Sequence, residues 1–168
     1  MNKNAHRIEL LSLVKMNITF LSTGKTSDKA IAENCRKYVS RLNNYCSFNW
    51  IETQDVKSLP PVVMKTKEGA LLKKYLNKGD HIILLDEKGK EFTSPAFAKF
   101  LLQKQVENKK HVIFILGGAH GFSEEIQALA NEKMSLSKMT FPHQLVRVIF
   151  LEQLYRAFTI IKNEPYHH

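Results

Sequence analysis

The residues best suited to chemistry lie in the last third of this 168-residue chain. A glycine turn, Gly117-Gly118-Ala-His-Gly121, follows a bounded apolar stretch, and glycine lets a ligand approach the backbone closely. A polar loop then leads to a mostly apolar helix with His143 and Arg147 near its start. Imidazole titrates near neutral pH and a guanidinium binds anions, so these side chains could move a proton and stabilise a negative charge. The combination indicates a small cofactor-dependent enzyme with a polyanionic substrate.

Two nucleotide-binding motifs are nearly present, and both fail. Gly24-Lys25-Thr26 resembles the end of a P-loop, but Thr19 stands where that motif needs its first glycine. Gly118-x-x-Gly121 could end a dinucleotide fingerprint, but Leu116 replaces the first glycine and residues 136–141 contain no acid for a ribose. ATP chemistry and nicotinamide chemistry are therefore poor interpretations. The glycine turn is either an ordinary strand-to-helix turn or a site for another ligand.

Short apolar segments alternate with longer segments of helical periodicity. We expect strands over residues 16–21, 47–52, 81–85 and 111–116, and helices over residues 28–42, 64–76, 94–106 and 123–133, followed by the final helix. This alternation predicts an α/β fold with a mostly parallel sheet and helices on both faces. Ligands of such sheets bind outside the carboxyl ends of the strands, which places Leu85-Asp86 and Leu116-Gly117 at the expected site.

The final helix is apolar around most of its circumference. Its polar residues fall on two faces, with His143, Gln144 and Arg147 on one and Glu152, Arg156 and Thr159 on the other. Such a helix is buried on more than one side, which in a chain this short indicates a subunit interface. Glu152 and Arg156 can form an i,i+4 pair. Arg147 has no obvious acidic partner nearby in sequence, which leaves a substrate or cofactor contact open.

The charge balance, 25 Lys+Arg against 16 Asp+Glu for a net charge of +9, favours a nucleic acid or another polyanion as partner. Cys35 and Cys46 form no Cys-x-x-Cys pair, and two cysteines are too few for a disulfide framework. No uninterrupted apolar run reaches the roughly 18–20 residues that span a bilayer. We therefore expect a cytoplasmic protein with no metal and no membrane partner.

The length predicts one domain. Residues 1–15 carry Glu9 inside their only apolar run, which is unlike a secretory signal, and a strand begins at Met16. We expect residues 1–15 to be an N-terminal extension or a mis-assigned start. Residues 16–168 would then form the single domain.

Five sequence blocks match one known family in order and spacing. They are Leu84-Leu85-Asp86-x-x-Gly89-Lys90, Gly117-Gly118-Ala-x-Gly121, Ser135-Leu-Ser-Lys-Met-Thr-Phe-Pro-His143-x-x-x-Arg147, Glu152-Gln-x-Tyr155-Arg156-Ala and Pro165-Tyr-His-His168. With them, residues 16–168 resemble the SPOUT-class ribosomal RNA large subunit methyltransferase H family, the pseudouridine N3-methyltransferases. The long block from Ser135 onward is the most specific part of the match.

The resemblance implies an α/β fold of the SPOUT type with a C-terminal deep trefoil knot. It also implies S-adenosylmethionine as methyl donor, held in a bent conformation, with S-adenosylhomocysteine as product and no metal. By position, the implied cofactor-binding residues are Leu85, Gly117, Gly118, Leu136, Ser137, Lys138, Met139, Thr140 and Phe141.

The implied substrate is a pseudouridine of 23S ribosomal RNA, in the stem-loop that forms an intersubunit bridge of assembled ribosomes. The family works as a homodimer, which agrees with the apolar final helix. The resemblance implies the ribosome as partner and no binding of DNA. Two rival interpretations remain: a non-catalytic ribosome-binding or assembly factor, and a knotted methyltransferase that acts on transfer RNA.

Methyl transfer to N3 requires the loss of the N3 proton and stabilisation of the resulting anion. Arg147 is a candidate for anion stabilisation or phosphate contact. His143, Tyr166, His167 and His168 are candidates for substrate positioning and proton removal. As alternatives, His143 could cap the start of its helix, and the final histidines could be a frayed terminus or the remnant of a purification tag.

Overall fold

The computed structural model describes residues 16–167 of the chain. The prediction for residues 1–15 falls outside this part, and so does the predicted role of His168. In order, the elements are β1 (Asn17–Ser22), α2 (Lys29–Leu42), β2 (Ser47–Glu52), α3 (Pro61–Lys73), β3 (His81–Glu91), α4 (Ser94–Val106), β4 (His111–Leu116), α5 (Glu124–Leu129), β5 (Glu132–Ser135), α6 (His143–Ile161) and a short 3-10 helix, η1 (Pro165–His167).

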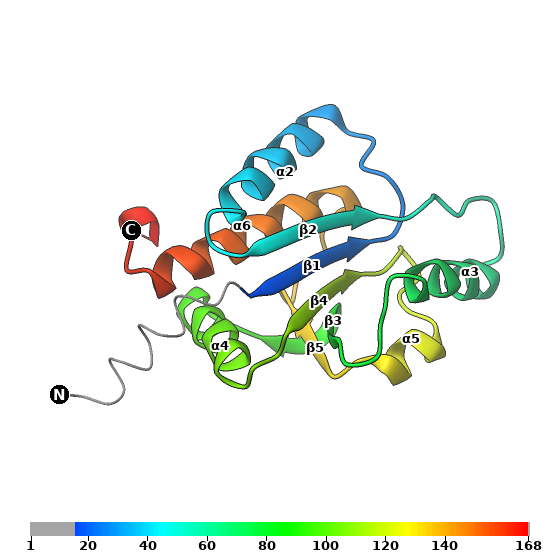
Figure 1. Cartoon of the computed structure of the whole chain (residues 1–168). Coiled ribbons are helices and arrows are strands. Elements are labelled where there is room, and N and C mark those ends of the chain that lie inside the picture. The colour runs from blue at the N-terminus through cyan, green and yellow to red at the C-terminus, as the bar shows by residue number, and fades with distance from the viewer. Residues whose placement is uncertain (1–15, 168) are drawn as a thin grey trace.

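The strands form one parallel sheet in the order β2-β1-β4-β3-β5 (Figure 1). β4 lies at its centre, between β1 and β3, and every residue from Val112 to Leu116 is buried. A strand covered on both faces reads as a continuous apolar run, which is why the sequence identified β4 so clearly. The expected parallel sheet with helices on both faces is confirmed.

Each face of the sheet has its own core. α2, α4 and α6 pack on one face, where the Phe150 ring lies 4.7 Å from the Phe20 ring and 4.9 Å from the Phe114 ring, centroid to centroid. α3 and α5 lie on the other face, over a smaller core that contains Ile113 and Ile126 (Figure 1). Neighbouring strand residues point to opposite faces, so Ile113 and Phe114 belong to different cores.

The region around β5 corrects the sequence prediction. A helix was expected over residues 123–133, but α5 ends at Leu129 and Glu132–Ser135 forms a strand beside β3. The strand is short and is placed by tertiary pairing: the Asn131 side chain accepts a hydrogen bond from the Ile82 backbone N–H at 2.7 Å. β3 is also longer than expected, and its pairing with β5 shifts register between Leu85 and Lys90.

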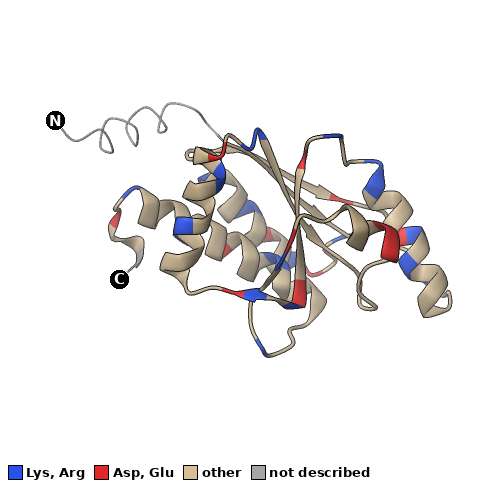
Figure 2. Cartoon of the chain, turned by 90° about the horizontal axis from the view of Figure 1, so that it is seen from below, with Lys and Arg blue, Asp and Glu red and all other residues tan. Residues whose placement is uncertain are grey.

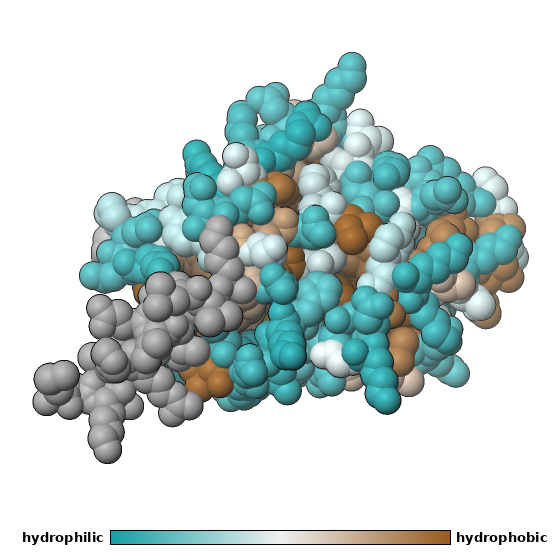
Figure 3. All heavy atoms as spheres, in the orientation of Figure 1, coloured by the Kyte–Doolittle hydropathy of each residue, from teal (hydrophilic) through white to brown (hydrophobic). Residues whose placement is uncertain are grey.

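The helix expected over residues 64–76 also begins earlier, at Pro61. A proline in the first helical turn needs no partner for its nitrogen and already has a helical φ angle. The first turn of α3 leaves Val62 71% exposed and Val63 39% exposed. Hydrophobic surface over the α3–α5 side of the molecule is visible in Figure 3, on a face that is otherwise mostly hydrophilic.

Charged residues are distributed over the whole described chain. Figure 2 shows Lys and Arg on several helices and loops, with Asp and Glu among them, so the positive charge is not confined to one element. Cys35 and Cys46 are both buried and free. Within residues 16–167, no helix combines the length and the apolarity needed to cross a membrane.

Candidate active site

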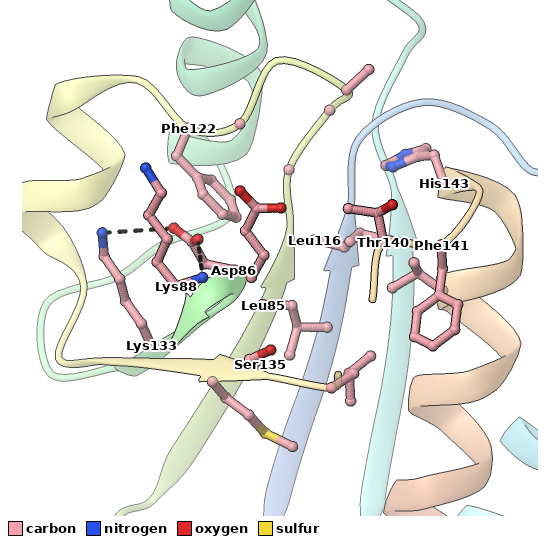
Figure 4. Close-up of a pocket in the computed structure, with 18 of the residues that line it drawn as sticks. Leu85, Asp86, Lys88, Leu116, Phe122, Lys133, Ser135, Thr140, Phe141 and His143 are labelled. Carbon is pink, nitrogen blue, oxygen red and sulfur yellow. Dashed lines mark hydrogen bonds and ion pairs between the residues drawn. The ribbon is translucent and has the colours of Figure 1, made fainter. Parts of the chain in front are cut away.

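A cavity of about 670 Å³ opens at the ends of β4 and β5, beside Leu85–Lys88 of β3. Its position confirms that Leu85-Asp86 and Leu116-Gly117 meet at the carboxyl edge of the sheet. Figure 4 shows Leu85 of β3, with Leu116 and Ser135 at the ends of β4 and β5, between two groups of side chains. Thr140, Phe141 and His143 lie on one side, and Asp86, Lys88 and Lys133 lie on the other.

The cavity is lined by every residue that the resemblance implied for the cofactor except one. The lining members of that set are Leu85, Gly117, Gly118, Leu136, Ser137, Met139, Thr140 and Phe141. Lys138 is not a lining residue; its ammonium group lies 3.9 Å from the Glu91 carboxylate, and both side chains face solvent. The sheet therefore brings together segments that are far apart in sequence.

The glycine turn forms one wall, and its glycines are required by close contacts. A Cβ atom on Gly117 would lie 2.9 Å from the ring of Phe122. A Cβ atom on Gly118 would lie 2.4 Å from a carboxylate oxygen of Glu68. Gly121 has a φ of +77° and donates its N–H to the Gly118 carbonyl at 3.0 Å, which closes the turn. The turn is therefore more specialised than an ordinary strand-to-helix connection.

The loop opposite the turn is held by its own hydroxyl groups. The Ser135 hydroxyl donates to the Ser137 carbonyl at 2.9 Å, and the Ser137 hydroxyl accepts from the Met139 N–H at 2.9 Å. These bonds leave the Met139 side chain 75% exposed. A loop of this kind offers backbone polar groups and apolar side chains together, which suits a planar heterocycle with polar edges.

His143 lines the cavity at the first turn of α6. Its Nε2 lies 3.3 Å from the Thr23 carbonyl and 3.4 Å from Arg147 Nη2. In the tautomer whose Nε2 donates to the carbonyl, the lone pair is on Nδ1. Burial lowers the pKa of His143 below its usual value, so the ring is neutral at pH 7. The helix itself begins after Pro142 without a side-chain cap. His143 thus lies at the cavity wall, and α6 has no side-chain cap of the kind that the sequence also allowed.

Arg147 is fully buried, and the structure supplies the acidic partner that its sequence neighbours lacked. Its Nη1 lies 2.7 Å from the Glu52 carboxylate at the end of β2, and its Nη2 donates to the Thr23 carbonyl at 2.7 Å. It also donates to the Thr26 hydroxyl and the Gly24 carbonyl. These bonds fasten the loop between β1 and α2 to α6. The guanidinium faces this loop and is not part of the cavity lining.

Tyr166 lies at the far end of α6. Its hydroxyl is 3.4 Å from the Tyr38 hydroxyl and donates to Glu152 at 3.4 Å, while its ring meets the edge of the Tyr155 ring. Glu152 also binds Arg156 at 2.6 Å, which confirms the expected i,i+4 pair. A helix of 19 residues is roughly 27 Å long, so within one chain Tyr166 and His143 are far apart. The predicted role of His167 rests on a side chain outside the described ones.

Sequence reasoning missed Glu68, which lies against the glycine turn from α3. The available signal was Gly69, because a glycine inside a helix often marks a close approach to another element. Within the described residues there is no group of three or more His, Cys, Asp or Glu side chains that could hold a metal ion.

A parallel α/β sheet with a glycine turn and a ligand-sized cavity at its carboxyl edge is typical of cofactor-binding α/β enzymes. The family model described as "Predicted SPOUT methyltransferase" matches residues 16–167. The chain belongs to the SPOUT methyltransferases, in the ribosomal RNA large subunit methyltransferase H family, as its sequence blocks indicated.

Curated relatives match almost from end to end. "Ribosomal RNA large subunit methyltransferase H" of Parabacteroides distasonis is 47% identical over 156 residues, which cover 91% of this chain and 99% of the relative. The proteins of the same name from Christiangramia forsetii and Geotalea daltonii are 44% and 41% identical, with 91% of this chain covered in both cases and 99% and 100% of the relative. Among solved structures, the SpoU methyltransferase AviRb from Streptomyces viridochromogenes, in complex with AdoMet, aligns with a TM-score of 0.42 at 12% identity. The alignment covers 89% of this chain and 61% of that chain.

Proposed function

We propose that this protein transfers a methyl group from S-adenosylmethionine to N3 of a pseudouridine in 23S ribosomal RNA. The observation that supports this proposal most directly is the cavity at the carboxyl edge of the sheet, which is built from the glycine turn and the loop over residues 136–141. The relatives' shared name supports the ribosomal RNA of the large subunit as substrate. The net charge of +9 supports a polyanionic partner, bound in a salt-dependent way.

The residues of the cavity fit the proposed cofactor. Its volume of about 670 Å³ is in the usual range for small-molecule sites. Leu85, Leu116 and Phe141 offer apolar surface for an adenine ring, and the loop backbone offers donors and acceptors for its edge. Gly117 and Gly118 line the cavity without side chains, so a ligand can approach their backbone closely. When bound, S-adenosylmethionine supplies an electrophilic methyl group on sulfur.

The chain's own task is to orient the acceptor and remove its proton. We assign proton removal to His143, which lines the cavity, and to its Nδ1 in the tautomer whose Nε2 donates to the Thr23 carbonyl. Arg147 acts as a positioning residue, because it holds the Thr23 carbonyl that in turn orients His143. Direct contact of Arg147 with the substrate would require it to leave Glu52 and Thr26.

The C-terminal residues can serve the cavity only from a second subunit. Tyr166 is anchored at the opposite end of α6 from His143, so we propose a homodimer in which residues 166–168 of one chain reach the cavity of the other. α6 supports such an interface: although it packs between α2 and α4, Leu145 is 38% exposed and Val148 and Ile149 are only partly buried.

Three finer features of the family complete the proposal. The C-terminal part would form a deep trefoil knot, a rare exception to normal chain topology, which would hold the segments after β3, β4 and β5 around one cavity. The target would lie in the stem-loop of the intersubunit bridge, and assembled ribosomes in the cytoplasm would be the natural substrate.

Two measurements test the proposal. Calorimetric titration with S-adenosylmethionine should show binding by the wild type and none by Gly117→Val, whose side chain would overlap the Phe122 ring and fill the turn. Ribosomes that lack the modification are then incubated with methyl-labelled cofactor, and the labelled nucleotide is mapped by mass spectrometry. Label in transfer RNA would favour the alternative of a knotted methyltransferase that acts on transfer RNA. A folded protein that binds ribosomes but no cofactor would be a non-catalytic factor.

A further inference from the structure

The chain turns back on α6 directly after that helix ends. Asn163 has a φ of +54°, a left-handed conformation that asparagine adopts more readily than most residues, and the Glu164 N–H donates to the Thr159 carbonyl at 2.9 Å. The short helix η1 (Pro165–His167) therefore packs against α6. The Tyr45 hydroxyl donates to the Glu164 carboxylate, which fastens the turn to the segment between α2 and β2.

The side chain of Tyr166 lies among aromatic and arginine side chains of its own chain. Its ring centroid is 4.8 Å from that of Tyr155, in an edge-on contact, and the central carbon of the Arg156 guanidinium lies over the same ring, 5.1 Å from the centroid. The Tyr38 hydroxyl of α2 is 3.4 Å from the Tyr166 hydroxyl. Edge-to-face rings and a guanidinium over a ring are both attractive arrangements, so Tyr166 is held from several sides.

Glu152 fixes the orientation of Arg156. One carboxylate oxygen of Glu152 accepts from Nε of Arg156 at 2.9 Å and from Nη2 at 2.6 Å. The two side chains keep only 18% and 27% of their surface exposed. A planar guanidinium bound through two of its N–H groups is fixed in a way that a lysine ammonium is not. The sequence block Glu152-Gln-x-Tyr155-Arg156 thus has a shared task, because three of its residues hold one another and the ring of Tyr166.

Stability of the fold does not account for this arrangement. An i,i+4 ion pair near the surface contributes little to stability, and the last residues of a chain are usually poorly ordered unless contacts hold them. A tail that serves a catalytic site must be placed before the substrate arrives, because a displacement of about 1 Å can slow a reaction about 100-fold.

We propose that Arg156 is a positioning residue, which holds Tyr166 and with it the C-terminal tail (residues 166–168) where the tail can serve the cavity of the partner subunit. The inference rests on the proposed function and on its homodimer. It gives a role in methyl transfer to an ion pair that lies at the opposite end of the molecule from the cavity of its own chain.

Arg156→Lys tests the proposal, because it keeps the positive charge but cannot bind Glu152 through two fixed N–H groups or lie flat over Tyr166. Methylation of ribosomes by this variant should be about 10- to 100-fold slower than by the wild type. Calorimetry should give an unchanged affinity for S-adenosylmethionine. Arg36→Lys is the matched control, because Arg36 is an exposed arginine of α2 and should leave both quantities unchanged. Tyr166→Ala should be at least as slow as Arg156→Lys, and adding Arg156→Lys to it should slow it no further.

Mixed dimers show which subunit needs Arg156. Each mixed dimer has one working cavity, because Gly117→Val should abolish cofactor binding in the other. If Arg156→Lys is in the chain with the working cavity, the tail comes from the Gly117→Val chain, and methylation should equal that of the same dimer with Arg156 unchanged. If Arg156→Lys and Gly117→Val are in one chain and its partner lacks residues 166–168, the altered tail serves the working cavity, and methylation should be slow.

Equal methylation by the wild type and Arg156→Lys would overturn this inference and leave the proposed function intact. Slowing that follows the chain with the working cavity would do the same, and so would weaker cofactor binding or a further loss beyond that of Tyr166→Ala. Mixed dimers that are inactive with Arg156 unchanged would overturn both the inference and the action of the tail across the dimer. No methylation by the wild type would overturn the proposed function itself.

Discussion

Replacing Arg147 by methionine tests whether this arginine supports the fold or contacts the substrate. The structure gives its guanidinium four partners on the loop after β1 and on β2: Thr23, Gly24, Thr26 and Glu52. Methionine fills similar space but removes the positive charge beside Glu52, which keeps only the N–H and hydroxyl of Thr26, and it removes a donor from the Thr23 and Gly24 carbonyls. The main consequence should therefore be a loss of stability.

The size of the loss follows from burial. Breaking a buried ion pair by removing one partner costs about 3–5 kcal/mol. The Arg147 side chain is 0% exposed, but that of Glu52 keeps 21% of its surface and can regain water, so we expect the lower end, about 3 kcal/mol. For a domain of this size that corresponds to a fall in melting temperature of roughly 6–12 °C.

Urea unfolding of Arg147→Met, Glu52→Gln and the double variant measures the effect. The double variant should lose about 1–3 kcal/mol less than the sum of the two single variants, since neither partner then remains unpaired. A midpoint for Arg147→Met equal to that of the wild type would refute the structural role. If ribosome methylation nevertheless fell in that folded variant, Arg147 would be a direct substrate contact.

Three further predictions concern the site and its supports. Burial lowers the pKa of His143, so below about pH 6.5 the folded chain binds fewer protons than the unfolded chain. The free energy of unfolding should therefore fall as the pH drops from about 6.5 towards the lowered pKa. Urea unfolding at a series of pH values should show a shallower fall for His143→Gln than for the wild type. Gly69→Ala should destabilise the protein by about 1–3 kcal/mol, because the new methyl group meets Ser123, and a more stable variant would contradict this packing. A chain without residues 166–168 should bind the cofactor but not methylate ribosomes. In a mixed dimer, the truncated chain supplies an intact cavity and a Gly117→Val chain supplies an intact tail. Such dimers should regain activity if the tail acts across the dimer, and inactive mixed dimers would count against that arrangement.

The sequence identified the helices and strands that can be recognised from the pattern of their own residues. β2 and β4 have the bounds that their apolar patterns predicted, and β4 was the clearest because both of its faces are buried. β5 was missed because its four residues include only two buried positions, and its conformation depends on pairing with β3. Local propensity gave way there to tertiary contacts.

The site was predictable in position but not in its internal contacts. The carboxyl-edge rule placed Leu85 and Gly117 together correctly. The partner of Arg147 was not predictable, because Glu52 comes from β2 and reaches α6 only through the order of the strands. Glu68 was missed for the same reason, since its environment is created by a glycine on a distant turn.

The strand order also has a consequence for how the chain folds while it is being synthesised. β1 pairs with β2, its neighbour in sequence, but its other edge pairs with β4, which is made only after α2, α3, β3 and α4. The nascent chain therefore presents a two-stranded ribbon with an open inner edge, and such a ribbon is only marginally stable alone. Insertion of β4 between β1 and β3 closes the sheet and should limit the folding rate, because it joins residues distant in sequence. The ligand cavity is completed later still, by β5 and the first turn of α6, so the cofactor can bind only after the chain has been made as far as α6.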